Sequence, residues 1–334
     1  MPFVLSPYRV LASLLAGMVL SVLWVNKSIA AYPDRPITIV VPFSPGGPTD
    51  KTARDLAQTL QKILGAPAIV VDNTAGAGGT IGAVRVIKSP PDGYTLLLAH
   101  IGMSTSYALY PKLTYSMLDD FEYLGVISEV PMVLVGRPNL KASNVAELIH
   151  LIGASNGTTT VGHAGIGSAS HLCSLLLQSH LKQTMTGISY KGVAPAMNDV
   201  VAGHVDLLCD QSITAGPQVE AGRLKAFAVT TTGRLAKPSL SNIPTLDESG
   251  MKGFNFSVWQ AVYAPRGTPK AILETLNNAL RAALKDPEFA KRQLADGVRI
   301  VTDTRLTPAG HKELMRTEMA KWTAIIKAAG VYAE

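Results

Sequence analysis

The chain has 334 residues, of which 47% are hydrophobic and 16% charged; this suits two domains of roughly 100–200 residues each and excludes a mainly disordered protein. Its 29 glycines and 21 prolines follow no triplet period, so they indicate tight loops and exclude collagen. The net charge of +6 is spread along the chain without a basic run, so we expect no nucleic acid as a partner.

The first thirty residues predict a secretory signal peptide. Residues 1–30 contain no acid, and Arg9 precedes an apolar run over 10–25 that is followed by a small-x-small sequence at 28–30. The run is shorter than the ~20 residues needed to cross a bilayer, which argues against the alternative of an uncleaved membrane anchor. We therefore expect cleavage before Ala31 and a soluble, exported mature protein.

Short β-branched runs and stretches with helical spacing alternate along the rest of the chain. The pattern predicts strands over 37–41, 68–71, 95–99, 158–162, 205–209 and 224–230. It predicts helices over 53–64, about 80–88, 168–180, 269–284 and 307–329. Because alternating strands and helices form crossover units, the expected fold class is α/β, with mainly parallel sheets covered on both faces.

The length of the chain predicts two sheets and therefore two lobes. Candidate crossings between the lobes lie near 128–131 and 254–258. Two crossings make one lobe discontinuous, so lobe I is expected to comprise 32–130 plus 257–334, and lobe II to comprise 131–256. Two connecting segments between lobes form a hinge.

Two glycine-rich loops each join a predicted strand to a predicted helix. The first covers 42–50, where Thr49 or Asp50 is placed to cap the helix, and the second covers 162–171. The first N–H groups of a helix lack internal partners and favour an anion. The first loop alone fits an ordinary strand–helix turn slightly better than a ligand site, but a pair of such loops, one in each lobe, would grip one anion across a cleft. Neither loop contains Lys or Arg, so backbone amides, hydroxyls and water would hold a carboxylate.

Catalytic motifs are missing from the sequence or have the wrong spacing. The segment 165–170 lacks the last glycine of a dinucleotide fingerprint, and the chain contains no phosphate loop, Gly-x-Ser-x-Gly elbow or His-Glu-x-x-His motif. We therefore expect no enzyme activity, no catalytic residue, no cofactor and no metal. The rival hypothesis is an exported serine hydrolase or transferase that uses Ser168 with His163 or His171.

Polar residues at two other strand ends are candidates for the same cleft. Asp210, followed by Gln211, would either receive a hydroxyl or an amine of the ligand or cap the next turn. His100, Ser104 and Thr105 follow the 95–99 strand and would line the first lobe's share of the cleft.

Cys173 and Cys209 are the only two cysteines. Their spacing fits neither a Cys-x-x-Cys motif nor a zinc site. Two buried, unpaired thiols are the favoured interpretation, while an oxidising compartment would also permit a disulfide.

Several motifs together give the chain a family resemblance from about Tyr32 to its C-terminus. They are Tyr-Pro-Asp-Arg-Pro-Ile at 32–37, Pro-Phe-Ser-Pro-Gly-Gly-Pro-Thr-Asp at 42–50, Asn-Thr-Ala-Gly-Ala-Gly-Gly-Thr-Ile-Gly at 73–82, Pro-Asp-Gly-Tyr-Thr-Leu at 91–96, Gly-Ile-Gly-Ser-Ala-Ser-His-Leu at 165–172 and Ala-Pro-Arg-Gly-Thr-Pro at 264–269. With these motifs the sequence resembles the substrate-binding proteins of tripartite tricarboxylate transporters, the Bug family of Gram-negative bacteria.

The resemblance implies a type II periplasmic binding protein fold, in which a periplasmic monomer closes two lobes on a small carboxylate like a Venus flytrap. It implies two membrane transporter subunits, one large and one small, as partners; a ligand sensor that docks a membrane kinase is the alternative. The ligand-binding residues expected from the loops and motifs are Phe43, Pro45, Gly46, Gly47, Pro48, Thr49, Asp50, Gly79, Thr80, His100, Ser104, Thr105, Gly165, Gly167, Ser168, Ala169, His171, Asp210 and Gln211.

Two segments depart from the family's pattern. One is 100–106, and the other is the pair Asp210-Gln211, where Asp-Asn is usual. These positions would border the distal end of the ligand, so a dicarboxylate, an aromatic acid, and a small amide or vitamin all stay open.

Overall fold

The computed structural model describes residues 32–330, and the predicted signal peptide lies outside this part of the chain. Its ten strands form one continuous sheet in the order β2-β1-β3-β9-β4-β7-β5-β6, with β8 and β10 both paired to β4. The strands are β1 (Ile37–Val41), β2 (Ile69–Asn73), β3 (Thr95–His100), β4 (Phe121–Gly136), β5 (Thr160–His163), β6 (Thr186–Ser189), β7 (Leu207–Gln211), β8 (Lys225–Val229), β9 (Ser257–Pro265) and β10 (Arg299–Ile300).

Helices cover both sides of this sheet. The α-helices are α2 (Pro48–Leu64), α3 (Thr80–Ile87), α4 (Ser106–Leu109), α5 (Val145–Ala154), α6 (Ala169–Leu181), α7 (Val193–Ala202), α8 (Ser212–Glu220), α9 (Lys270–Lys285), α10 (Pro287–Ala295) and α11 (Pro308–Ala329). The 3-10 turns are η1 (Ala77–Gly79), η2 (Ile101–Thr105), η3 (Pro238–Leu240) and η4 (Thr304–Leu306). Apolar side chains form one buried cluster on each side of the strands.

The sheet is parallel at both flanks and antiparallel in the middle. β2, β1 and β3 run parallel, as do β6, β5 and β7. β9 is antiparallel to both of its neighbours, β3 and β4, and β4 is antiparallel to β7 and β8. The expectation of mainly parallel sheets is therefore right for the flanks and wrong for the centre, since β4 and β9 run in opposite directions beside each other.

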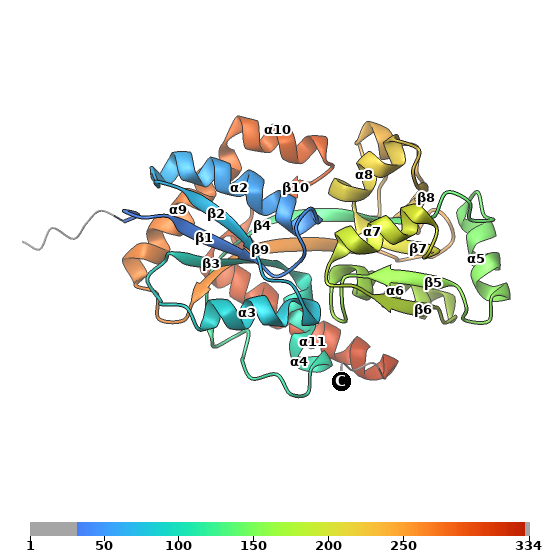
Figure 1. Ribbon diagram of the computed structural model, residues 1–334, viewed down its shortest axis with the longest axis horizontal. Helices are drawn as coiled ribbons and strands as arrows, with labels where there is room; N and C mark the ends of the chain where they lie inside the picture. Colours follow the sequence, from blue (N-terminus) through green and yellow to red (C-terminus); the bar gives the residue numbers. More distant parts are fainter. Residues whose placement is uncertain (1–31, 331–334) are drawn as a thin grey trace, which may run out of the picture.

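Strand β4 takes part in two different sets of strand pairs. From Phe121 to Pro131 it pairs with β9, and from Met132 to Gly136 it pairs with β7 and β8. Figure 1 shows β4 and β9 crossing the middle of the molecule, between a group of elements that includes α2, α3 and α9 and a group that includes α5 to α8. The sequence placed connecting strands near 128–131, within β4, and near 254–258, at the start of β9, but it did not predict the full length of either strand.

The two cysteines form a disulfide, which corrects the favoured interpretation of two unpaired thiols. Cys173 on α6 and Cys209 on β7 are both fully buried, with their Cα atoms 6.2 Å apart. Sequence spacing gave no hint of the pair, because the two residues meet only when α6 packs against β7. The bond joins the two elements whose ends carry Ser168 and Asp210.

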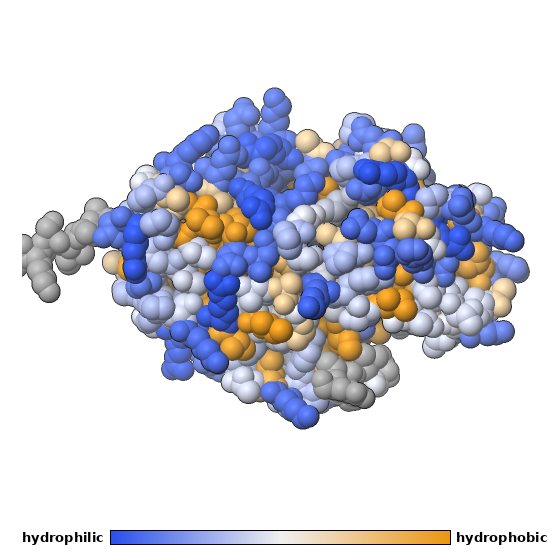
Figure 2. All heavy atoms as spheres, viewed as in Figure 1, coloured by the Kyte–Doolittle hydropathy of each residue, from blue (hydrophilic) through white to orange (hydrophobic). Residues whose placement is uncertain are grey.

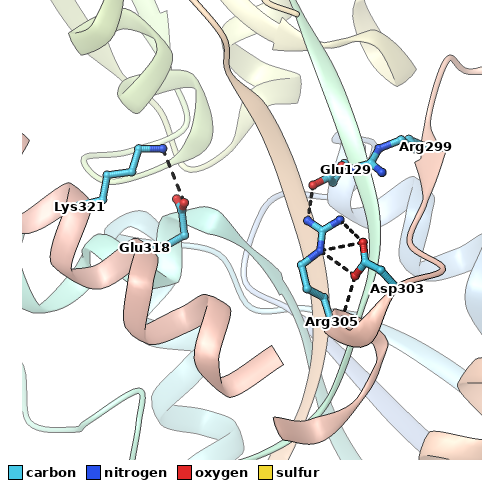
Figure 3. Close-up of polar contacts among 6 residues, drawn as sticks. All are labelled: Glu129, Arg299, Asp303, Arg305, Glu318 and Lys321. Atoms are coloured by element: carbon cyan, nitrogen blue, oxygen red, sulfur yellow. Dashed lines mark hydrogen bonds and ion pairs between the residues drawn. The ribbon is translucent and has the colours of Figure 1, made fainter. Parts of the chain in front are cut away.

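A group of ion pairs fastens η4 and β10 to the middle of β4. Glu129 on β4 pairs with Arg305 of η4 and Arg299 of β10, and Arg305 also pairs with Asp303 (Figure 3). Hydrogen bonds from Arg305 lower the pKa of Asp303 to about 2. These contacts hold the segment 299–306, which precedes α11, against the part of β4 that pairs with β9.

The surface shows no single dominant apolar area on the face in Figure 2, where apolar residues lie scattered among hydrophilic ones. Among the residues that the structure describes, the exposed large hydrophobic side chains are Ile63, Val70, Ile81, Tyr107 and Leu294. Within residues 32–330, no helix has the length and apolar character needed to cross a membrane.

His311 should make the fold sensitive to acid. It lies on α11 against the rings of Tyr123, Trp259 and Tyr263 and is fully buried, and neither ring nitrogen has a hydrogen-bond partner in the described part of the chain. Burial lowers its pKa to about 3. As the pH falls from about 6.5 towards 3, the unfolded chain takes up a proton that the folded protein does not, so stability is lost; at pH 5 the loss from this residue is about 2 kcal/mol.

Urea unfolding at pH 7 and pH 5 measures this effect. We expect the loss of unfolding free energy between the two pH values to be smaller in His311→Leu than in the unaltered protein by about 2 kcal/mol. The control His150→Leu removes an exposed imidazole from the middle of α5. An equal pH dependence in His311→Leu and the unaltered protein would contradict the assignment.

Candidate functional site

The first glycine loop places the start of α2 in the interior of the molecule. β1 is a buried β-branched strand, and Gly46, at φ +78°, turns the chain after it. α2 then begins at Pro48, with Gly47 as its N-cap and without a capping side chain. Neither Thr49 nor Asp50 is the cap, because the helix begins one residue before Thr49. Proline suits the first helical position, since its missing N–H would have had no partner there.

Asp50 fastens the loop in place. One of its carboxylate oxygens accepts from the Gly46 N–H at 2.9 Å and from Arg54 Nε at 3.0 Å, and the other accepts from Asn73 Nδ2 at 3.0 Å. Burial would raise the pKa of Asp50, but the hydrogen bonds from Arg54, Gly46 and Asn73 outweigh it and hold the pKa below its usual value. The carboxylate is thus used to join the loop to α2 and to the end of β2.

The second glycine loop delivers the start of α6 in the same way. Ser168 is the N-cap, and its Oγ accepts from the His171 N–H at 3.3 Å and lies 3.1 Å from Ser170 Oγ. Ser170 Oγ in turn accepts from the Ala164 N–H at 2.9 Å. This chain of hydroxyls ties the first turn of the helix back to the end of β5.

Both helix starts open onto one small cavity. It is lined by residues of the first loop, of the second loop and of the strand ends beside them: Phe43, Gly47, Pro48, Thr49, His100, Met132, Ala164, Ser168, Ala169, Ser170, Val193, Asp210 and Gln211. The lining contains no Lys or Arg. The space left for the centre of a water molecule is only about 10 Å³, which is room for about one water.

Unused backbone donors are concentrated at this cavity. The first N–H groups of a helix have no acceptor within the helix. In α2 the bonded N–H groups begin with Lys51, which donates to the Gly47 carbonyl oxygen, and in α6 they begin with His171, which donates to Ser168 Oγ. Thr49 and Ala169 come before these positions, and both residues line the cavity. With two helix dipoles ending here, the cavity favours negative charge.

His100 adds a fixed donor to the same cavity. Its ring stacks on Phe43 at 4.5 Å between ring centres, and its Nδ1 accepts from the Gly102 N–H at 3.0 Å. Burial lowers the pKa of His100 to about 4, so the ring is neutral at pH 7. Because Nδ1 is an acceptor, the single ring proton is on Nε2.

Asp210 and Gln211 end β7 at the opposite wall. Asp210 Oδ2 accepts from Thr214 Oγ1 at 2.5 Å, and its Oδ1 has no hydrogen-bond partner within residues 32–330. Gln211 Oε1 accepts from Gln260 Nε2 of β9 at 3.0 Å. Gln211, rather than Asp210, is the N-cap of α8, and it makes no side-chain capping bond.

Nine of the residues expected at the site therefore line one cavity. They are Phe43, Gly47, Pro48, Thr49, His100, Ser168, Ala169, Asp210 and Gln211. The other expected residues lie around it without lining it, and most of them hold the two loops or join them. Pro45 and Gly46 are exposed on the outer side of the first loop, next to the bonds of Asp50.

The remaining expected residues form the rim where the two loops meet. Thr105 Oγ1 donates to the Gly102 carbonyl at 2.7 Å and contacts the Gly167 carbonyl at 3.3 Å. Ser104 donates to the Ile101 carbonyl at 2.7 Å, so its hydroxyl serves η2.

Glycines allow the close approach at this rim. A Cβ on Gly165, whose φ is +101°, would lie 3.0 Å from the backbone nitrogen of Gly78. Gly79, at φ +104°, packs against Phe43 at the N-cap of α3. The Thr80 hydroxyl donates to the Ala77 carbonyl at 2.9 Å.

Four cavity residues were missed by the sequence pattern. Ser170 lies in the first turn of α6, and Ala164 follows the end of β5, so both are close neighbours of expected residues. Met132 and Val193 come from β4 and from the start of α7. Neither carries a chemical signal in the sequence, because an apolar residue at a cavity wall looks like any other core residue.

The geometry opposes the serine hydrolase hypothesis. Within the described residues Ser168 Oγ makes no hydrogen bond to an imidazole, and His171 Nδ1 accepts from the Gly167 N–H at 3.1 Å. Burial, together with the neighbouring His163, lowers the pKa of His171 to about 3. A nucleophilic serine needs a base on its own hydroxyl, and here the histidine supports the loop. Residues 32–330 also contain no cluster of side chains suited to a metal ion.

Comparison with known proteins agrees with this geometry. Residues 52–331 match the tripartite tricarboxylate transporter family receptor. The chain belongs to this family. The structure of the periplasmic binding protein BugD is 40% identical, covers 91% of this chain and all of its own, and superposes with a TM-score of 0.86.

Two related structures contain ligands. MatC from Rhodopseudomonas palustris with bound malate is 35% identical, covers 88% of this chain and all of its own, and has a TM-score of 0.83. Rpa4515 of R. palustris with adipate is 33% identical, covers 90% of this chain and 99% of its own, and has a TM-score of 0.84. The family resemblance and the α/β periplasmic binding protein fold expected from the motifs are thus confirmed. The receptor family consists of binding proteins of transporters and not of enzymes.

Proposed function

We propose that the protein captures a small carboxylate solute in the periplasm and delivers it to a tripartite tricarboxylate-type secondary transporter. The family receptors serve such transporters, and the related structures with malate and adipate hold dicarboxylates. The proposed site is the cavity between the two glycine loops, together with the rim residues that position them.

One observation carries the proposal: the N-terminal ends of α2 and α6 open onto a single buried cavity that has no Lys or Arg in its lining. Two sets of unused N–H groups and two helix dipoles there favour an anion. The neutral His100 ring and the Ser168 hydroxyl supply further hydrogen bonds of fixed direction. A carboxylate fits this set, because its oxygens accept from several donors at once.

Binding requires the protein to open. The cavity is far smaller than a dicarboxylate, so a solute enters only when the two loops move apart. We propose that lobe I comprises 32–130 plus 257–334 and lobe II 131–256. The change of partners along β4 between Pro131 and Met132, and the course of β9 beside it, support this division. These strands would act as the hinge between an open and a closed form.

The route to the periplasm and the partners complete the proposal. We propose that residues 1–30 are a cleavable signal peptide, that the mature protein is a soluble monomer, and that its closed form docks a large and a small membrane subunit. The apolar run at 10–25 that follows Arg9 supports export.

A thermal-shift screen with small carboxylic acids tests the proposed function. A ligand present at 100 times its dissociation constant stabilises the protein by about 2.7 kcal/mol, so we expect the matching acid to raise the melting temperature by roughly 5 °C or more. Matched amides and alcohols should leave the melting temperature unchanged, since they carry no negative charge. A screen in which amides shift it as much as acids do would refute carboxylate capture.

Gly47→Leu should abolish the shift. Gly47 has an ordinary φ of −76°, and an added Cβ would meet only the Ser44 carbonyl oxygen at 3.4 Å, so the variant is expected to fold. Its side chain would then fill the cavity that Gly47 lines. An unchanged acid-induced shift in Gly47→Leu would place the ligand elsewhere.

A further inference from the structure

The carboxylate of Asp210 is the one group in the cavity with an unused acceptor and a formal charge. Asp210 is only 1% exposed and lies at the carboxyl end of β7. Thr214 occupies its Oδ2, and Oδ1 is buried without a partner. Buried polar atoms of this kind almost always find a hydrogen bond, so the vacant acceptor points to a donor that arrives with the ligand.

Among the described residues, no side chain or backbone group donates a hydrogen bond to Asp210 Oδ1. Lys51 of α2 is the cation whose charge acts on the Asp210 carboxyl. Its Nζ donates to the Ile213 carbonyl at 3.3 Å, and Lys51 does not line the cavity. On the side of β3, His100 is neutral. On the side of α8, Thr214 is already used. The Asp210 carboxylate thus faces a cavity built for an anion, with no cation between them.

This arrangement discriminates among carboxylates. A solute that offers only carboxylate oxygens would leave Asp210 Oδ1 unpaired and would bring a like charge towards it in a space that excludes water. A solute that also carries an O–H or N–H donor near its carboxylate would satisfy Oδ1. The two helix ends would hold the carboxylate, and Asp210 would accept a hydrogen bond from the hydroxyl or ammonium substituent.

We propose that the ligand is a carboxylate bearing a hydroxyl or ammonium group that donates to Asp210 Oδ1, and that Asp210 determines specificity against unsubstituted acids. This inference rests on the proposed function, since it concerns the same cavity. It goes further by naming the class of solute: hydroxy- or amino-carboxylates.

Protonation of Asp210 should relax this selectivity. Burial raises the pKa of Asp210 to about 7, against smaller opposing effects of Thr214, the Gln211 N–H and Lys51. Below that pH the protonated carboxyl becomes a donor and accepts an unsubstituted carboxylate more readily. The preference should therefore be strongest at pH 8 and weaken towards pH 6.

Calorimetry with succinate, malate and aspartate tests the inference, because these four-carbon diacids differ only in carrying hydrogen, hydroxyl or ammonium at one carbon. Glutarate, 2-hydroxyglutarate and glutamate repeat the series with a longer chain. At pH 8 we expect a substituted acid to bind roughly tenfold or more tighter than its unsubstituted parent. Tighter malate would identify the donor as a hydroxyl, and tighter aspartate as an ammonium group.

Asp210→Asn removes the charge and keeps the shape, and should reduce this preference to about threefold or less, mainly by improving binding of the unsubstituted acid. Glu220→Gln is the matched control, since it removes one exposed acid from the end of α8. Its preference should equal that of the unaltered protein. Melting curves of both variants check that they are folded.

The possible outcomes separate the two proposals. If unsubstituted acids bind as tightly as substituted ones, or if the preference survives in Asp210→Asn, the inference about Asp210 is wrong while carboxylate capture stands. If no carboxylate in either series or in the thermal-shift panel binds, the proposed function fails, and the inference fails with it.

Discussion

Replacing Gly192 with threonine should weaken ligand binding by about a hundredfold, because the overpacking cost of up to about 3 kcal/mol falls only on the closed form. A Cβ on Gly192 would lie 2.0 Å from Ser44 Oγ and 2.7 Å from the Ser44 backbone nitrogen. Gly192 precedes α7, whereas Ser44 belongs to the first glycine loop. The clash therefore arises between the two proposed lobes and disappears when they separate.

The backbone at Gly192 accepts a side chain without strain. Its φ of 171° and ψ of 176° are extended, and it is the N-cap of α7, a position where threonine is about as favourable as glycine. We therefore expect Gly192→Thr to melt at the same temperature as the unaltered protein when no ligand is added. Only the gain in melting temperature caused by the ligand should be lost.

Calorimetry and melting curves on two variants check this prediction. Gly233→Thr is the matched control, because a Cβ on the exposed Gly233 meets nothing within 4 Å. Equal affinities in Gly192→Thr and Gly233→Thr would mean that the ligand does not need the close approach of Ser44 and Gly192, and would contradict capture by closure.

Reduction of the Cys173–Cys209 disulfide should cost about 4 kcal/mol of unfolding free energy, which the chain-entropy relation gives for a bond between residues 36 apart. The bond restricts the unfolded chain across the segment that contains β6 and α7. It also holds the start of α6 against the end of β7, so the two walls that carry Ser168 and Asp210 keep their spacing. We expect ligand affinity to fall along with stability after reduction.

Urea unfolding with and without a reductant measures the contribution of the bond. The double variant Cys173→Ala with Cys209→Ala is the control, since the reductant should leave its unfolding free energy unchanged. Titration of thiols in the unfolded, unreduced protein should find none among these two cysteines. Equal stability of the oxidised and reduced protein would refute the stabilising role.

Local patterns were enough to predict the units that build the flanks of the sheet. The β-branched run at β1, the helical spacing in α2 and the glycine loop between them follow one another within some thirty residues, and the same logic applies to β5 and α6. The physical reason is that strand pleat, helical period and glycine turns depend on near neighbours. For this reason the two helix starts could be predicted as candidate anion sites, and nine of the expected residues line one cavity.

The sequence by itself thus determined the α/β units, the two glycine loops and the family, because each of these depends on residues that are close together in the sequence. Only the tertiary structure decided that β4 and β9 cross the centre antiparallel, that Cys173 meets Cys209, that Asn73 of β2 bonds to Asp50, and that Met132 and Val193 join Asp210 at one wall. These features depend on pairing between segments far apart in the chain, where side-chain packing rather than local spacing selects the partner.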